Sequence, residues 1–213
     1  MKMFLFLKSL SRSVHQEQPD PPEFIKTDDQ CTSLTVWRKS LIISCNGFTV
    51  IDSKGNLVFR VDNYIGRPEE LILMDGSGKS VLTMRRRKKL TVVDSWHVYE
   101  GEVDDCIRKK LSKRPICCVK KQMNILQSGQ NILAYVYYGA SNKRYAYTVE
   151  GSYANRSCKV FDESRRVVAE IKRKEAAIGG ISFGVEVFML IVQPGFDPAF
   201  AMALVLLLDQ MFS

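Results

Sequence analysis

The C-terminal segment carries the clearest pattern of apolar positions in the chain. From Asp197 to Met211 the sequence reads DPAFAMALVLLLDQM, and every position from Ala199 to Leu208 is apolar. Asp197 is a favourable N-cap and Pro198 suits the first helical position, so we predict a helix of about 14 residues. A helix without a polar face needs apolar partners on every side. It is shorter than the roughly 20 apolar residues of a membrane span, so we expect it to be buried inside the protein.

The rest of the chain alternates apolar and polar positions in short runs, a pattern typical of β-strands. We predict strands at residues 35–44, 89–93, 97–100, 116–122, 132–138, 145–151, 158–161 and 185–192. A sheet of so many strands must close or split, and closure removes its exposed edges. The sequence therefore predicts a mainly β fold in which a closed sheet surrounds one central, C-terminal, hydrophobic helix.

Three further segments share one hairpin pattern. They are Val50–Val61, Leu73–Met84 and Val160–Ile171, and each has an aspartate at the start of its turn. In the first two, a glycine follows three residues later and can adopt a positive φ; the third has Arg165 at that position. This spacing predicts hairpins built on a type I turn with a bulge. Because the aspartate and the apolar residues recur at the same spacing, one repeated hairpin plan is favoured over three unrelated hairpins.

The N-terminal residues differ in composition from the rest of the chain. Before Glu17 there are basic residues and serines but no acid, which weakly resembles a transit peptide. Pro19, Pro21 and Pro22 then indicate a linker. We expect residues 1–30 to form a variable tail and residues 31–213 to form a single domain. Scattered cysteines without a clear signal peptide favour a reducing cytosolic or nuclear setting.

Basic residues are concentrated in one part of the sequence. The formal net charge is +8, and the pI is near 9.2. Residues 85–121 contain twelve Lys and Arg against five Asp and Glu, so nearly all of the surplus lies there. Such a surplus favours anionic partners, either a membrane surface or nucleic acid. The alternative is a basic protein whose charge serves only its solubility.

The sharpest basic run gives the candidate binding site, which consists of Arg85, Arg86, Arg87, Lys88 and Lys89. Each basic residue near an anionic bilayer contributes about 1 kcal/mol to attraction. The run also fits a nuclear localisation pattern. A third interpretation is a solvated strand end whose charges prevent edge pairing. We predict no transmembrane span, and the absence of an obvious stacking platform makes nucleic acid a less favoured partner.

The residues indicate no enzyme and no cofactor or metal. Gly78-Lys79-Ser80 lacks the first glycine of a P-loop and precedes a predicted strand, whereas a P-loop opens a helix. With two histidines and no C-x-x-C pair, a zinc site is not expected. Asp104-Asp105 lacks the alternating spacing of a calcium loop. Cys106 or Cys118 acting with His97 is the one nucleophilic arrangement left open.

Several blocks of the sequence resemble the plant LURP-one-related family. The blocks are Gly47–Val61, Leu73–Arg86 followed by Trp96, Gly151–Cys158, Val168–Lys174, Phe183–Leu190 and Pro194–Leu204. The resemblance covers about residues 34–211. It implies a fold similar to the tubby C-terminal domain and to phospholipid scramblases, with an antiparallel barrel of about twelve strands around a central hydrophobic helix.

The same resemblance implies more about partners than about chemistry. The family is linked to plant defence and has no established enzymatic activity. Tubby relatives bind phosphatidylinositol bisphosphate through basic side chains and can move to the nucleus, whereas scramblase relatives are membrane-associated and bind calcium. We carry no specific ligand residue over from either relative to this chain. We therefore expect a non-enzymatic cytoplasmic protein, peripheral at the plasma membrane or nuclear, that binds anionic phospholipid; the alternatives are a protein-interaction scaffold and a nucleic-acid binder.

Overall fold

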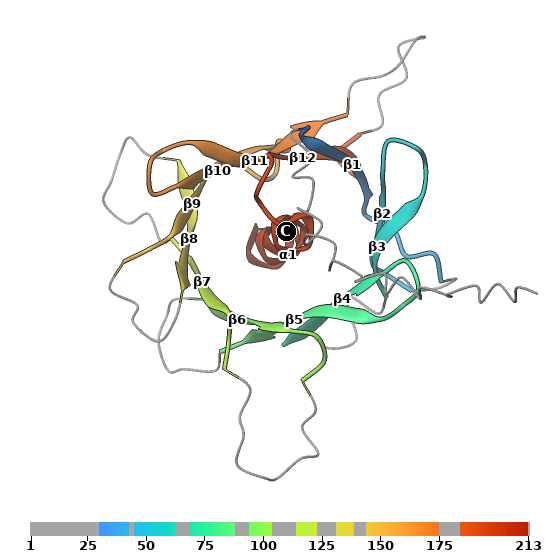
Figure 1. Cartoon of the computed structure of the whole chain (residues 1–213), viewed down its shortest axis with the longest axis horizontal. Coiled ribbons are helices and arrows are strands. Elements are labelled where there is room, and N and C mark those ends of the chain that lie inside the picture. The colour runs from blue at the N-terminus through green and yellow to red at the C-terminus, as the bar shows by residue number, and fades with distance from the viewer. Residues whose placement is uncertain are drawn as a thin grey trace, which may run out of the picture.

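The C-terminal helix lies along the axis of a closed antiparallel sheet in the computed structural model of the chain (Figure 1). The structure describes residues 30–42, 45–62, 69–87, 94–103, 114–122, 131–138, 144–174 and 184–212. The described residues form twelve strands and one helix, which confirms the predicted fold class.

Each strand hydrogen-bonds to its neighbours in sequence, and the first strand closes the barrel against the last. The closing contact pairs Thr32 with Val192 and Trp37 with Val187. The strands are β1 Thr32–Trp37, β2 Phe48–Ile51, β3 Leu57–Val61, β4 Glu70–Asp75, β5 Ser80–Arg86, β6 Ser95–Glu100, β7 Cys117–Lys121, β8 Ile132–Tyr138, β9 Tyr147–Ser152, β10 Ser157–Asp162, β11 Val167–Arg173 and β12 Val187–Val192. Helix α1 spans Pro198–Phe212.

Some predicted strand limits were wrong by several residues. The strand predicted at 35–44 begins at Thr32 and ends at Trp37, and the one predicted at 185–192 begins at Val187. The pairing between β1 and β12 sets both limits, because a strand extends only as far as its partner supplies backbone hydrogen bonds. The strand predicted at 89–93 lies outside the described residues.

The three predicted hairpins share one turn geometry. Their turns have positive φ values of 87° at Gly55, 91° at Gly78 and 62° at Arg165. In each turn the Oδ1 atom of the opening aspartate accepts the N–H group four residues later, at 2.8, 3.0 and 2.9 Å. Each hairpin also has a register shift beside its turn. The prediction of bulged hairpins on a common plan is therefore confirmed.

Arg165 occupies a backbone conformation that is costly for a residue with a Cβ atom. Its guanidinium group pairs with Glu150, with one contact of 3.1 Å between Nη2 and Oε2. It also lies 4.3 Å from the centre of the Phe161 ring. These contacts explain how the third turn tolerates an arginine where the other two have glycine.

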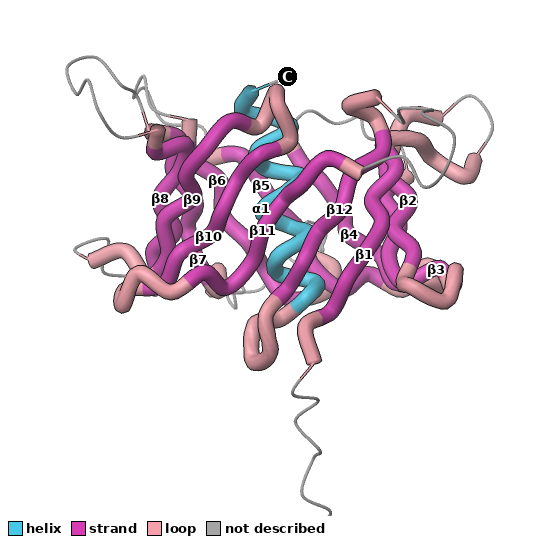
Figure 2. Tube along the Cα trace, turned by 90° about the horizontal axis from the view of Figure 1, so that it is seen from above, coloured by secondary structure: helices cyan, strands magenta, loops and turns pink. Residues whose placement is uncertain are grey.

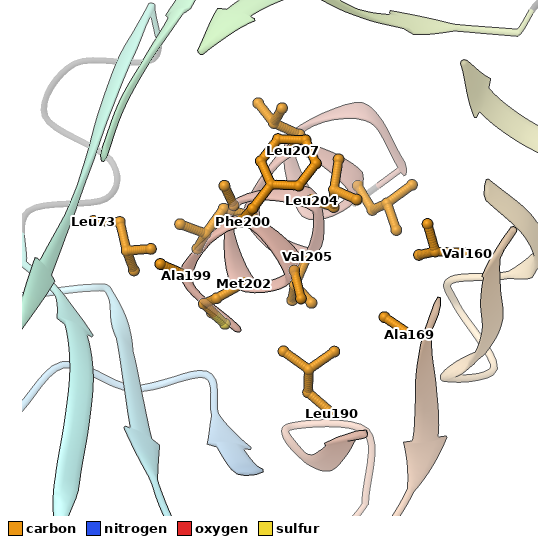
Figure 3. Close-up of a cluster of buried hydrophobic side chains, with 14 of the residues drawn as sticks. Leu73, Val160, Ala169, Leu190, Ala199, Phe200, Met202, Leu204, Val205 and Leu207 are labelled. Carbon is orange, nitrogen blue, oxygen red and sulfur yellow. The ribbon is translucent and has the colours of Figure 1, made fainter. Parts of the chain in front are cut away.

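The interior of the barrel is filled by helix α1 and by the inward side chains of the strands. Every residue from Ala199 to Asp209 is buried. Figure 3 shows helix side chains such as Val205 directed towards Leu190 and Ala169 of the surrounding strands. This arrangement satisfies the requirement, evident from the sequence, that an all-apolar helix be enclosed on all sides.

The helix contains a single charged residue, Asp209, and that residue is buried. Its carboxylate accepts hydrogen bonds from Arg38 Nε at 3.2 Å and from the Tyr153 hydroxyl at 3.0 Å. The Tyr153 ring lies under the Arg156 guanidinium, 4.1 Å away, and that group donates to the carbonyl of Val185. Because a buried carboxylate needs its partners, this network fixes the axial position of α1 in the barrel.

Shortening one central helix side chain should destabilise the whole protein. Leu206 is fully buried, so Leu206→Ala leaves a cavity and is expected to lower the free energy of unfolding by about 3–5 kcal/mol. Urea unfolding followed by circular dichroism measures the change. The matched control is Leu41→Ala on the surface, for which we expect a change below about 0.5 kcal/mol. Equal effects of the two variants would contradict the enclosed helix.

The Asp209 network gives a second stability prediction. Asp209→Ala removes the acceptor for Arg38 and Tyr153 and should cost about 1–3 kcal/mol in unfolding free energy. Asp209→Asn keeps one carbonyl acceptor of the same shape and should cost less. The same unfolding assay compares the two, and a larger loss for the asparagine variant would contradict the assigned hydrogen bonds.

Candidate functional site

The two ends of the barrel differ in charge. Strands β1, β3, β5, β7, β9 and β11 run towards the end at which helix α1 terminates, which lies at the top of Figure 2. We name this the basic end, and its described basic residues are Arg38, Lys39, Arg85, Arg86, Arg87, Lys121, Arg156, Arg173 and Lys174. Its described acidic residues are fewer: Asp62, Glu69, Glu70, Asp94, Glu186 and Asp209.

The structure divides the predicted basic run rather than presenting it as one patch. Successive residues of a strand face opposite sides of the sheet, so Arg85 and Arg86 point in different directions. Arg85 pairs with Glu70, and its Nη2 atom donates to the carbonyl of Val103 at 2.8 Å. Arg86 Nε donates to Asp94 Oδ1 at 2.9 Å. Both side chains are therefore held by neighbouring carboxylates.

The remaining members of the run begin the segment after β5. Arg87 donates its backbone N–H to the carbonyl of Ser95, which extends the β5–β6 pairing by one residue. Within the described residues, neither Arg87 nor Lys39 has a carboxylate within ion-pair distance. Lys88 and Lys89 lie outside the described residues. Arg87 is thus the described member of the run whose charge is available to a partner.

Large apolar side chains are exposed at the same end of the barrel. The exposed fractions are 41% for Trp37, 52% for Leu41 and 46% for Ile42, and Val185 is similarly exposed. Trp37 ends β1, and Lys39 lies 5.3 Å from the centre of its ring. The sequence interpretation assigned this segment to a strand and missed it as a site. The sequence did contain a signal for these exposed apolar residues: Leu41 and Ile42 follow three polar or basic residues at the end of a predicted strand.

The turn after β1 holds these apolar side chains in place. The Ser40 hydroxyl donates to Asp62 Oδ1 at 3.1 Å and accepts the N–H of Ile42 at 3.0 Å. The N–H of Cys45 donates to the carbonyl of Ile42 at 3.2 Å. A buried serine thus anchors the turn from within, which leaves the Leu41 and Ile42 side chains on its outside.

The C-terminus of helix α1 adds to the electrostatics of the basic end. The partial negative charge of a helix C-terminus attracts cations within its last turn. Lys121, the last residue of β7, donates from Nζ to the carbonyl of Met211, and its ammonium group lies 4.4 Å from the Phe212 ring centre. The lysine therefore satisfies a terminal carbonyl of the helix and supports the strand-to-helix contact at this end.

The nucleophilic arrangement left open by the sequence is partly formed. His97 and Cys118 are register partners on β6 and β7, and the Tyr99 hydroxyl lies 3.4 Å from His97 Nδ1. Cys118 is 5% exposed and so has little access to a substrate. Cys106 lies outside the described residues.

The other two described core thiols are also unsuited to act as nucleophiles. Burial raises the pKa of Cys117 to about 12, with a contribution from Cys118, and burial raises the pKa of Cys158 to about 12 as well. A thiol with so high a pKa holds almost no thiolate at neutral pH. In the described part of the chain, no three metal-ligating side chains converge, and no helix is long and apolar enough to cross a membrane.

The barrel with its enclosed helix and the matching sequence together define the class of protein. The LURP-one-related family matches residues 32–209, and the chain belongs to that family. The match spans every strand and nearly all of helix α1.

Individual relatives from Arabidopsis thaliana extend the comparison. Protein LURP-one-related 17 is 52% identical, over 99% of this chain and 100% of its own length. Protein LURP-one-related 8 is 45% identical, over 93% of this chain and 97% of its own. A crystal structure of another Arabidopsis thaliana protein has a TM-score of 0.60 and 27% identity, covering 85% of this chain and 91% of that one. The likeness thus extends to sequence and fold.

Proposed function

We propose that this protein is a non-enzymatic intracellular tether that docks through the basic end of its barrel on anionic, phosphoinositide-containing membrane. The observation that carries the proposal is the coincidence at one end of exposed apolar side chains and a surplus of basic ones. Proteins that lie on membranes combine these two features, because apolar groups enter the interface while cations attract anionic lipid.

The apolar contribution comes from the turn after β1. Tryptophan is favoured at the level of lipid headgroups, and Trp37 is placed at the edge of the barrel where it would meet them. Leu41 and Ile42 would enter more deeply, each contributing up to about 1.5–3 kcal/mol if fully removed from water. The hydrogen bond from the Ile42 N–H to Ser40 already restrains residues 40–42, which lowers the conformational entropy that their insertion would cost.

The basic contribution comes from Lys39, from Arg87 and from the adjacent Lys88 and Lys89 of the sequence. Lys39 and Arg87 have no carboxylate partner among the described residues, whereas Arg85 and Arg86 are paired. The two paired arginines therefore support the strand end more than they attract lipid. The proposed site retains the predicted run but moves its centre from β5 towards the segment after it.

The protein proposed here is not an enzyme, for a physical reason. An enzyme needs polar groups that converge on a space large enough for a substrate. Helix α1 fills the middle of the barrel with hydrocarbon, and the described core thiols Cys117 and Cys158 have raised pKa values. The family resemblance suggests a role in plant defence or in transcriptional regulation. In either role, such a protein would act through the place at which it is bound and not through catalysis.

A protein-interaction scaffold without a lipid ligand is the second candidate. The outer face of β8 carries Tyr135 and Tyr137, and the Tyr135 ring lies 5.1 Å from that of Tyr145. Lys120 on the adjacent strand lies 4.6 Å from the centre of the Tyr137 ring. Tyrosine is enriched at the energetic centres of protein interfaces, which favours this face as a partner surface.

Vesicle co-sedimentation distinguishes the two candidates. We expect the purified protein to sediment with vesicles that contain phosphatidylinositol bisphosphate at physiological salt. We expect much less to sediment with neutral vesicles of the same size. Higher salt should weaken binding, because exposed charges are screened beyond about 8 Å at physiological ionic strength. An absence of binding, or binding at low salt only, would overturn the membrane proposal and favour the scaffold.

Charge reversal tests which end of the barrel meets the lipid. The triple variant Arg87→Glu, Lys88→Glu, Lys89→Glu should weaken binding at least about tenfold, at about 1 kcal/mol for each basic residue. The matched control reverses the same number of charges at the opposite end, with Lys54→Glu, Lys79→Glu and Arg114→Glu. Equal losses for the two triple variants would show a net-charge effect without a site.

Polar substitution in the turn tests the apolar contribution separately. Leu41→Ser with Ile42→Ser should also reduce vesicle binding about tenfold, and the loss should persist at high salt because hydrophobic insertion is not screened. Both side chains are exposed, so the unfolding midpoint should stay within a few degrees of the native value. Unchanged binding of this double variant would place the contact elsewhere.

A further inference from the structure

A cavity of about 210 Å³ opens at the end of the barrel opposite the basic end, beside the start of helix α1. Four aromatic side chains form much of its wall: Tyr138, Tyr147, Phe196 and Phe200. They come from three separate parts of the chain, namely the end of β8, the start of β9 and the segment that leads into α1 together with its first turn. The cavity is accessible, because Tyr138 is 42% exposed.

The four rings form a connected cluster around this space. The ring centres of Tyr138 and Tyr147 lie 6.0 Å apart, and those of Tyr147 and Phe196 lie 5.2 Å apart, both edge to face. Phe200 lies 5.7 Å from Phe196 and 6.0 Å from Tyr138. Edge-to-face pairs place the positive edge of one ring against the negative face of the next, so the four rings hold one another in position around the cavity.

The electrostatics of the cavity favour a cation. Asp197 lines it, is exposed to solvent, and is the one carboxylate among its eight described lining residues, none of which is basic. Burial raises the pKa of Tyr147, so its phenol stays neutral at physiological pH. The described residues around the cavity therefore supply aromatic rings, two phenol hydroxyls and one negative charge.

The adjacent helix N-terminus does not reverse this preference. Helix N-termini attract anions through free N–H groups, but Pro198 has no N–H group. The N–H of Ala199 donates to Asp197 Oδ1 at 2.9 Å, and the N–H of Ala201 donates to the Asp197 carbonyl at 2.9 Å. The N-terminus of α1 is thus already occupied by the N-cap aspartate of the chain itself.

We propose that this aromatic cavity binds a methylated ammonium head group of the choline type, with Asp197 as its counter-ion. A quaternary ammonium carries no N–H donors, so it loses little when aromatic faces replace its water. A lysine-like ammonium is more strongly hydrated, so it would lose more on entering a site whose wall is made mostly of aromatic and aliphatic side chains. The volume is below the roughly 300–1,000 Å³ of sites for larger ligands, which suits a single head group.

The same chemistry occurs in free choline compounds and in the head group of phosphatidylcholine. The cavity lies at the opposite end from Trp37, Leu41 and Arg87, so one bilayer cannot contact both regions. We therefore expect a soluble choline compound to be the ligand. The choice of a soluble ligand rests on the proposed membrane contact, whereas the choline site itself does not, so each proposal can fail while the other holds.

The test is a titration of the full-length ¹⁵N-labelled protein followed by NMR, with choline and its neutral analogue 3,3-dimethylbutanol. The two probes have the same shape, but a carbon replaces the charged nitrogen in the analogue. We expect choline to shift the amide resonances of Gly195 and Ala199 and to bind about tenfold more tightly than the analogue. A parallel arm uses phosphatidylcholine vesicles. Binding in that arm but not by free choline would assign the same chemistry to the lipid.

Conservative variants separate the cation site from an apolar pocket. Tyr138→Phe keeps the ring and should bind choline as the native protein does, whereas Tyr138→Leu should lose about fivefold or more. Asp197→Asn removes the charge but keeps a good N-cap, so it should weaken binding about two- to fivefold with little change in the unfolding midpoint. Tyr145→Leu, an exposed tyrosine outside the cavity, is the matched control.

Three results would overturn the proposal. The first is equal affinity for choline and 3,3-dimethylbutanol, which would identify a purely apolar cavity. The second is the absence of resonance shifts with choline together with no binding of phosphatidylcholine vesicles. The third is an equal loss of affinity in the Tyr138→Leu and Tyr145→Leu variants, which would show that ring contacts at the cavity do not hold the ligand.

Discussion

The enclosure of helix α1 is the constraint on which the rest of the structure depends. Residues 199–209 are buried all round, so the sheet must close, and the strands must direct apolar side chains inwards along their length. Closure in turn leaves no free sheet edge, because β1 pairs with β12. The described core is therefore filled mainly by packed apolar side chains.

Asp209 couples this packing to the orientation of the helix. Close packing of the apolar side chains already resists sliding and rotation of the helix. The buried carboxylate adds a directional restraint, because only one axial position brings it to Arg38 and Tyr153. The polar network thereby sets which helix residues reach each end, including Phe200 at the aromatic cavity and Met211 beside Lys121.

The two ends of the barrel differ in the side chains that they expose. One combines exposed Trp37, Leu41 and Ile42 with basic residues, and the other presents an aromatic cavity beside Asp197. Their separation along the barrel axis allows two independent contacts on one small protein.

The sequence by itself determined the features that arise from local pattern. The apolar run after the Asp197-Pro198 cap predicted an enclosed helix, and the aspartate and glycine spacings around Asp52 and Asp75 specify bulged turns through short-range hydrogen bonds. The strand limits, the ion pairs and the aromatic cluster depend on contacts between distant residues, and the tertiary structure alone decided them. It limited β1 to Thr32–Trp37, brought Glu70 and Asp94 to Arg85 and Arg86, and gathered rings from β8, β9 and the start of α1. The residues that pair β1 with β12 lie 150 or more positions apart in the sequence. Only the register of the closed barrel brings such partners together, so no local pattern could show them.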